Sequence, residues 1–179
     1  MEDTLRSGLL SVVLPSYNEE ASIPRAADTI TAILIDADIP HELVFVDDGS
    51  RDRTWTVIQE QAGRHPQVRG VRFSRNFGKE AAIFAGLAQA RGDCTLVMDC
   101  DLQHPPEKAV EMYRLWQEGY QVVEGVKASR GKENPLHTFA AKSFYSIISR
   151  ATGIDMSRAS DFKLLDRRAA VSYTHLRAH

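Results

Sequence analysis

The feature of this sequence that most constrains its fold is a regular alternation of short, largely apolar runs with longer segments of helical spacing. The predicted strands are 10–14, 42–46, 68–73, 95–98 and 120–125. The predicted helices between them are 21–37, 53–63, 79–91 and 106–118. Apolar strands that alternate with helices are typical of a parallel sheet buried on both faces. The sequence therefore predicts an α/β fold with a mostly parallel sheet and helices on both faces.

Composition is consistent with one globular domain, because 43% of the 179 residues are hydrophobic. No apolar run approaches the roughly 18 residues that a membrane span needs. The two cysteines, Cys94 and Cys100, have neither a C-x-x-C spacing nor a metal-finger pattern. With no signal peptide at the start, we expect both to be free thiols in a reducing cytosol.

Charge is distributed unevenly along the chain. Residues 1–125 carry 12 Lys/Arg and 20 Asp/Glu, whereas residues 126–179 carry 10 Lys/Arg and 4 Asp/Glu. The basic C-terminal third suggests an anionic partner for that third, and the alternative is chance clustering on a solvated face.

Polar clusters follow three of the predicted strands. They are Tyr17-Asn18-Glu19, Asp47-Asp48 and Asp99–Gln103. Ligands of open parallel sheets bind beyond the carboxyl ends of the strands, so these clusters are expected to converge on one crevice. The sequence has no G-x-G-x-x-G after its first strand and no G-x-x-x-x-G-K-[ST], so dinucleotide and P-loop binding are not supported.

The spacing of Asp99, Asp101 and Gln103 gives them one parity, so they face the same way if the chain stays extended. Oxygen ligands at this spacing suit Mg²⁺ or Mn²⁺, and such a cation would relieve the repulsion between two carboxylates. The alternative is a pair of capping or turn aspartates. The segment Asp47-Asp48-Gly49-Ser50 is equally ambiguous. It can form a simple turn, or one of its carboxylates can accept hydrogen bonds from the N–H groups of a nucleobase. Beside two prolines, His104 is more simply a loop residue than a ligand.

The order of four motifs is more specific than any one of them. The motifs are LPSYNE, VFVDDGS, SRNFGKEAAIFAGLAQARGD and VMDCDLQHPPE. In this order they resemble the family 2 glycosyltransferases of GT-A fold, and among those the polyprenyl-phosphate sugar transferases. YQVVEGVKASR, SFYSIISRATG and SDFKLLDRR extend the resemblance to about Arg168.

The resemblance implies roles for individual residues. Those implied to hold the nucleotide sugar are Pro15, Tyr17, Glu19, Val46, Asp48, Asp99 and Lys127. Metal ligands are implied at Asp99, Asp101 and Gln103, with Mg²⁺ or Mn²⁺ on the donor diphosphate, and catalytic roles at Asp101 and Asp161. The acceptor phosphate is expected at Lys163, Arg130 and Lys142. Lys127 stands where the family often has an arginine on the donor phosphates. An ammonium group, which acts as a point charge, would therefore replace a guanidinium group that can form two parallel hydrogen bonds.

The implied partners are a nucleotide sugar linked to uridine or guanosine, a polyprenyl phosphate and a membrane surface, with no nucleic acid. The resemblance implies a peripheral protein on the cytoplasmic side of the membrane, with a membrane anchor expected only in a longer form. We expect 1–171 to be a GT-A catalytic domain shortened at its C-terminal end, and 172–179 to be a tail of doubtful origin.

The resemblance implies transfer of a sugar from the nucleotide to a polyprenyl phosphate, with inversion of the anomeric centre. Three other functions stay open. One is a glycosyltransferase acting on a glycan hydroxyl, and another is a nucleotide-binding module without turnover. A phosphoacceptor receiver domain also clusters aspartates on a parallel sheet, but it explains neither LPSYNE nor the D-x-D-x-Q run.

Overall fold

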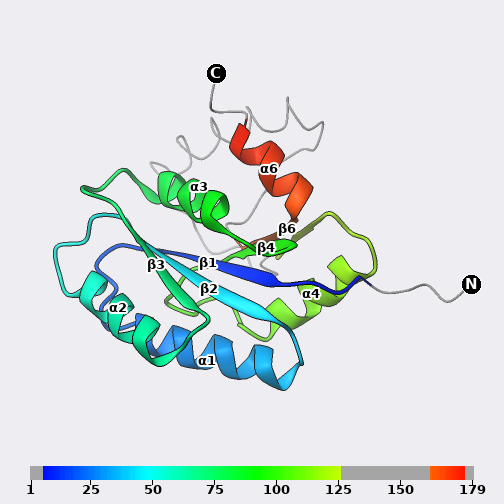
Figure 1. Ribbon diagram of the computed structural model, residues 1–179, viewed down its shortest axis with the longest axis horizontal. Coiled ribbons are helices and arrows are strands. Elements are labelled where there is room, and N and C mark those ends of the chain that lie inside the picture. The colour runs from blue at the N-terminus through cyan, green and yellow to red at the C-terminus, as the bar shows by residue number, and fades with distance from the viewer. Residues whose placement is uncertain (1–5, 126–161, 176–179) are drawn as a thin grey trace, which may run out of the picture.

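The computed structural model describes residues 6–125 and 162–175, which form a central sheet with helices on both faces (Figure 1). The sheet has six strands in the order β3-β2-β1-β4-β6-β5. The strands are β1 (Leu10–Ser16), β2 (His41–Asp47), β3 (Val68–Arg72), β4 (Cys94–Val97), β5 (Val122–Glu124) and β6 (Lys163–Asp166). This is the α/β architecture that the sequence predicts.

Most of the sheet is parallel. β1 pairs in parallel with β2 and β4, and β2 pairs in parallel with β3. The sequence did not predict β6, which runs antiparallel to both β4 and β5. The predicted strand 120–125 is shorter in the structure, as β5, and it lies at the edge of the sheet.

All four predicted helices are present, with ends within a few residues of the predicted ones. They are α1 (Ile23–Asp36), α2 (Thr54–Arg64), α3 (Lys79–Gln89) and α4 (Lys108–Gln117). A further helix, α6 (Arg167–His175), was not predicted, and it crosses the boundary proposed after residue 171. Within the described parts of the chain, none of the helices has the length and hydrophobicity needed to cross a bilayer.

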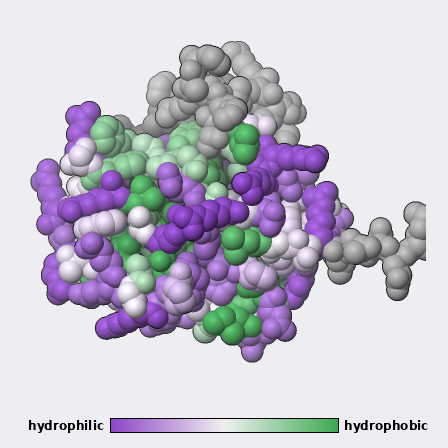
Figure 2. Space-filling model, viewed as in Figure 1, coloured by the Kyte–Doolittle hydropathy of each residue, from purple (hydrophilic) through white to green (hydrophobic). Residues whose placement is uncertain are grey.

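The helices divide the core into two layers. Side chains of α1, α2 and α4 pack on one face of the sheet, whereas α3 and α6 pack on the other. β1 is buried along its whole length, and its residues alternate between these layers. Val12 and Leu14 point toward α1, whereas Val13 points toward α3. Figure 2 shows apolar side chains gathered over α3 in the same view.

Close packing of α3 on β1 leads to a stability prediction. A Cβ added at Gly86 of α3 would lie 2.2 Å from Cγ1 of the buried Val13. Since the β-branched Val13 has little freedom to move, Gly86→Ala should lower the free energy of unfolding by about 1–3 kcal/mol. Gly63→Ala in α2 is the matched control, because a Cβ there meets nothing within 4 Å. It should stabilise the protein by about 0.5–1 kcal/mol. Urea denaturation of both variants measures this; equal effects would contradict the packing argument.

A buried carboxylate joins three strands near the amino ends of β1 and β2. Glu42 accepts hydrogen bonds from Ser11 Oγ at 2.6 Å and from the backbone N–H of Arg91 at 2.7 Å. The Arg69 guanidinium donates two more, at 2.8 and 3.0 Å. Burial alone would raise the pKa of Glu42, but these hydrogen bonds and the Arg69 charge outweigh it and hold the pKa below its usual 4.5.

A pH-dependent stability follows from this lowered pKa. The stabilisation is complete above the unfolded pKa near 4.5 and is lost as the pH falls through the lower folded value. Glu42→Gln should therefore lower the free energy of unfolding by about 1–3 kcal/mol at neutral pH. The difference from the wild type should shrink below pH 4.5. Urea titrations across this range check it, and a difference that does not depend on pH would contradict it.

Candidate functional site

A pocket of about 330 Å³ lies at the carboxyl edge of the parallel strands. Its lining comes from the end of β1, from the segments that follow β1, β2 and β4, and from α3 with the segment just before it. The lining residues are Pro15, Ser16, Tyr17, Glu19, Asp48, Asn76, Gly78, Lys79, Ala82, Asp99, Cys100 and Asp101. The prediction that the three polar clusters converge on one crevice is therefore confirmed.

The segments after β1 and β2 are tied to each other by hydrogen bonds. The N–H of Asn18 donates to Ser50 Oγ at 2.9 Å, and the Asn18 side-chain oxygen accepts from the N–H of Arg51 at 2.9 Å. The N–H of Glu19 donates to Thr54 Oγ1 at 2.8 Å. These bonds fix the turn that carries Tyr17 and Glu19 into the pocket.

The two aspartates after β2 face different environments. Asp47 is fully buried and accepts a hydrogen bond from the N–H of Ser50 at 2.9 Å. Its other oxygen forms an ion pair with Arg72 Nε at 3.5 Å but accepts no hydrogen bond from the described residues. Asp48 lines the pocket, whereas Val46 packs in the layer beneath α3 and is not among the lining residues.

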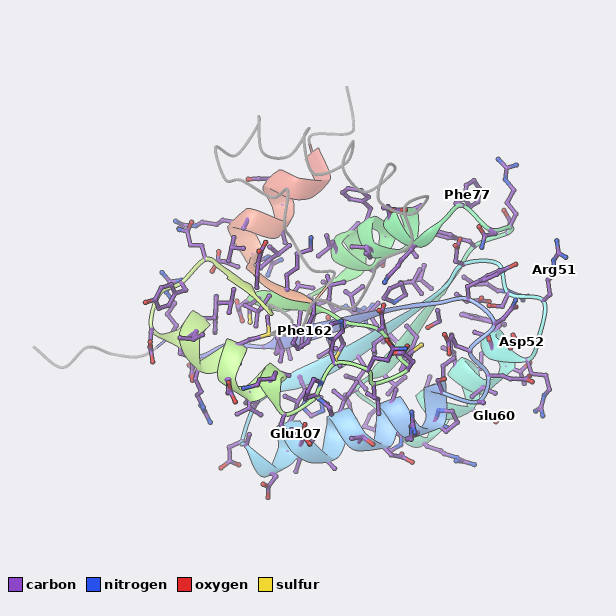
Figure 3. The ribbon with its side chains drawn as sticks, turned by 180° about the vertical axis from the view of Figure 1, so that it is seen from behind. Arg51, Asp52, Glu60, Phe77, Glu107 and Phe162 are labelled. Carbon is purple, nitrogen blue, oxygen red and sulfur yellow. The ribbon has the colours of Figure 1, made fainter. Side chains whose placement is uncertain are left out.

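The Asp48 carboxylate also holds the segment that leads into α3. One oxygen accepts from the N–H of Phe77 at 2.7 Å, and the other from the N–H of Gly78 at 3.0 Å. Gly49 permits this approach, because its φ is +68° and a Cβ there would lie 2.3 Å from the Arg75 carbonyl carbon. In Figure 3 Phe77 lies on the same side of the molecule as Arg51 and Asp52.

Asp99 and Asp101 lie on a turn and not on a continued strand. β4 ends at Val97, and Leu102 has a left-handed φ of +60°. The extended geometry assumed for Asp99, Asp101 and Gln103 is therefore wrong. Both aspartates line the pocket and Gln103 does not; instead its N–H donates to Asp101 Oδ1 at 3.0 Å. A metal-ligand role for the Gln103 side chain stays a prediction.

Cys100 separates the two aspartates and points into the core. Its thiol contacts Ser16 Oγ at 3.7 Å and the Pro15 carbonyl at 3.9 Å. Burial raises the pKa of this thiol to about 12, so it is protonated and unreactive at neutral pH. Both cysteines of the chain are buried free thiols, as the sequence predicts.

A lysine that sequence reasoning did not assign lies in the pocket. Lys79 Nζ forms an ion pair with Asp99 Oδ1 at 2.8 Å. The signal was present, because SRNFGKEAAI begins one of the four motifs, but no residue of that motif was given a role. The pairing shows that a cation fits beside Asp99.

The residues present fit a hard divalent cation. Mg²⁺ is usually bound through one or two carboxylates, with waters and substrate phosphates completing its coordination. Asp99 and Asp101 supply two carboxylates at the pocket wall. The described residues contain no group of three or more His, Cys, Asp or Glu arranged to hold a metal, so the phosphates of a ligand would complete the coordination of a cation that these two carboxylates bind.

Several predicted site residues are outside the described residues. They are Lys127, predicted for the donor, Arg130 and Lys142, predicted for the acceptor phosphate, and Asp161, predicted to be catalytic. Lys163 begins β6, where it pairs in register with Val97, and only 2% of its surface is exposed. It does not line the pocket.

The segment before β6 nevertheless contacts the loop that follows Asp101. The Phe162 ring stacks on His104 with 4.8 Å between ring centroids and 7° between planes. Figure 3 labels Phe162 near the middle of the molecule. This stacking gives His104 a packing role, consistent with a loop residue, and it places Phe162 beside the loop that follows Asp101.

The sheet and the acidic pocket at its carboxyl edge are those of a GT-A glycosyltransferase fold. The mannosyltransferase PcManGT from Pyrobaculum calidifontis, solved in complex with GDP-Man and Mn²⁺, matches with a TM-score of 0.61 and 23% identity. The match covers 91% of this chain and 46% of that one. The model of glycosyl transferase family 2 matches residues 11–172, and the chain belongs to this family.

Curated relatives agree with this assignment. The chain is 40% identical over 159 residues to the uncharacterized glycosyltransferase YkcC of Bacillus subtilis (strain 168), covering 88% of this chain and 49% of YkcC. It is 38% identical over 149 residues to the undecaprenyl-phosphate 4-deoxy-4-formamido-L-arabinose transferase of Pseudomonas aeruginosa (strain LESB58), covering 83% and 44%. The chain thus spans about half the length of these relatives.

The double role of Asp48 leads to a prediction. Asp48→Asn replaces one acceptor oxygen by an amide that faces an N–H donor, so the free energy of unfolding should fall by about 1–3 kcal/mol without any ligand. Urea denaturation measures this. Nucleoside binding, followed by calorimetry, should also weaken, because the segment at Phe77 and Gly78 loses its anchor. Unchanged stability with weaker binding would assign Asp48 to the base alone.

Proposed function

We propose that this protein transfers a sugar from a nucleotide-sugar donor to a polyprenyl phosphate, inverting the anomeric centre. The observation that carries the proposal is the pocket that brings Glu19, Asp48, Asp99 and Asp101 together at the carboxyl edge of a family 2 chain. Support for the lipid acceptor comes from the undecaprenyl-phosphate transferases among the relatives.

The donor would lie across this pocket. Pro15 near the end of β1, with Tyr17 and Glu19 directly after that strand, would contact the nucleoside, and Asp48 would face the base. Val46 would contribute through packing, since it is fully buried and is not among the residues that line the pocket. The proposed base is uracil or guanine.

Asp99 and Asp101 would hold Mg²⁺ or Mn²⁺ against the donor diphosphate. A divalent cation there supplies positive charge where negative charge develops as the diphosphate leaves. Asp101 would also keep the turn in place, because its carboxylate accepts the N–H of Gln103 and its carbonyl accepts from Arg25 at 3.0 Å.

The acceptor phosphate would attack the anomeric carbon on the face opposite the diphosphate. A phosphate oxygen forms the new C–O bond while the bond to the diphosphate breaks, which inverts the centre. A phosphate monoester has a second pKa of about 6, so the nucleophile needs little help in losing a proton. Arg130, Lys142 and Lys163 would supply positive charge, and Asp161 would orient them.

A polyprenyl acceptor places the reaction at a membrane surface, on its cytoplasmic side. The basic balance of residues 126–179, with 10 Lys/Arg and 4 Asp/Glu, favours contact with anionic phosphates there. A peripheral association, with cell-envelope or glycan biosynthesis as its setting, follows from this acceptor.

The test is transfer of a radiolabelled sugar from UDP- and GDP-linked donors to a short-chain polyprenyl phosphate with Mn²⁺. Asp101→Ala should reduce transfer by roughly a hundredfold or more, because it removes a metal ligand at the diphosphate. Asp36→Ala, at the exposed far end of α1, is the matched control and should leave transfer unchanged.

A sugar alcohol serves as the second acceptor in this assay. Transfer to the alcohol and none to the phosphate would replace the proposal by a hydroxyl-directed transferase. Donor binding without transfer to either acceptor would indicate a nucleotide-binding module.

A further inference from the structure

The charges around the pocket are unbalanced for an anionic ligand. Of the described residues that line it, four carry carboxylates: Glu19, Asp48, Asp99 and Asp101. Lys79 is the one cationic side chain among these described lining residues. A nucleotide diphosphate would therefore meet mainly negative charge, apart from this ammonium group and any metal that it brings.

The position of Lys79 is not explained by helix stability. It is the first residue of α3, where the helix dipole favours acidic side chains and disfavours a cation. The residues before it are anchored, because the N–H groups of Phe77 and Gly78 donate to Asp48. Asp48, the carboxylate proposed to face the base, thus fixes the backbone position from which the Lys79 side chain extends.

The Lys79–Asp99 ion pair is suited to exchange. The two side chains are 41% and 32% exposed, so water screens the pair and its net contribution to stability is small. Asp99 would gain more from a divalent cation than from an ammonium group, and Lys79 would gain an anionic partner in the donor once a diphosphate is bound.

We infer that Lys79 is a ligand of the donor diphosphate that Asp99 holds in place until metal and donor bind. Asp99 then exchanges the ammonium group for the metal, and Lys79 turns to a neighbouring diphosphate oxygen. This inference rests on the proposed function, since it deepens the description of the same donor site. It gives the pocket a protein-borne cation in addition to the metal.

If Lys79 exchanges partners in this way, its removal has opposite effects on the affinities for metal and for diphosphate, which loss of a merely structural contact would not have. Lys79 and the metal compete for Asp99, whereas Lys79 and the metal both attract the diphosphate. Removing the ammonium group should therefore strengthen binding of the metal alone and weaken binding of the nucleotide diphosphate. Loss of a merely structural contact would move both affinities in the same direction or neither.

The experiment is isothermal titration calorimetry on the wild type, Lys79→Ala and Lys79→Gln. With Mn²⁺ alone, both variants should bind severalfold more tightly than the wild type. With UDP or GDP in the presence of saturating Mn²⁺, both should bind roughly tenfold or more weakly, the usual effect of losing a charge-assisted hydrogen bond. Uridine or guanosine, which lack phosphate, should bind all three proteins equally.

Lys79→Arg is the matched control, because it keeps the charge and should retain most of the affinity for the diphosphate. Thermal unfolding shows whether each variant is folded, and Lys79→Gln keeps the test valid if Lys79→Ala is not. Unchanged affinity for UDP and GDP in both neutral variants, or parallel weakening of nucleosides and diphosphates, would overturn the inference. If the wild type bound neither UDP nor GDP, the proposed function itself would fail.

Discussion

The burial of β1 on both faces is the constraint on which the rest of this structure depends. Every residue of this strand is buried, with β2 on one side, β4 on the other and a layer of helices above and below. β1 ends level with β2, at Ser16 and Asp47, and runs three residues beyond Val13, which pairs with the last residue of β4, so its carboxyl end opens into the space between the loops. Pro15 and Ser16 lie at that point, and the pocket begins there because the core ends there.

Hydrogen bonds between loops then join the two halves of the pocket. Asp48 receives the N–H groups that precede α3, and Lys79 at the start of α3 reaches Asp99 after β4. One short segment therefore contacts the carboxylate proposed for the base and the carboxylate proposed for the metal.

The sequence predicts the central strands well because each is a short apolar run buried by helices that are local in sequence. It misses β6, because KLLD is short, begins with a lysine and becomes a strand by pairing with β4 and β5, which both lie far away in the chain. The sequence groups Gln103 with the two aspartates because alternate residues of an extended chain point the same way. The left-handed backbone at Leu102 breaks the extended conformation, so this grouping does not hold. Lys79 is missed because a lysine at the start of a helix looks like a solvated residue until Asp99 is seen beside it.

The distribution of charge along the chain explains why binding of two anionic ligands would need cations from more than one source. Residues 1–125 carry 20 Asp/Glu against 12 Lys/Arg, and the pocket lies in this acidic part. An anionic donor would be repelled there unless positive charge came with it or lay close by, and the proposed metal and Lys79 meet these two conditions. An acceptor phosphate would add a second anion beside the first. Residues 126–179 carry 10 Lys/Arg against 4 Asp/Glu, so this part of the chain has the excess positive charge that a second phosphate would need.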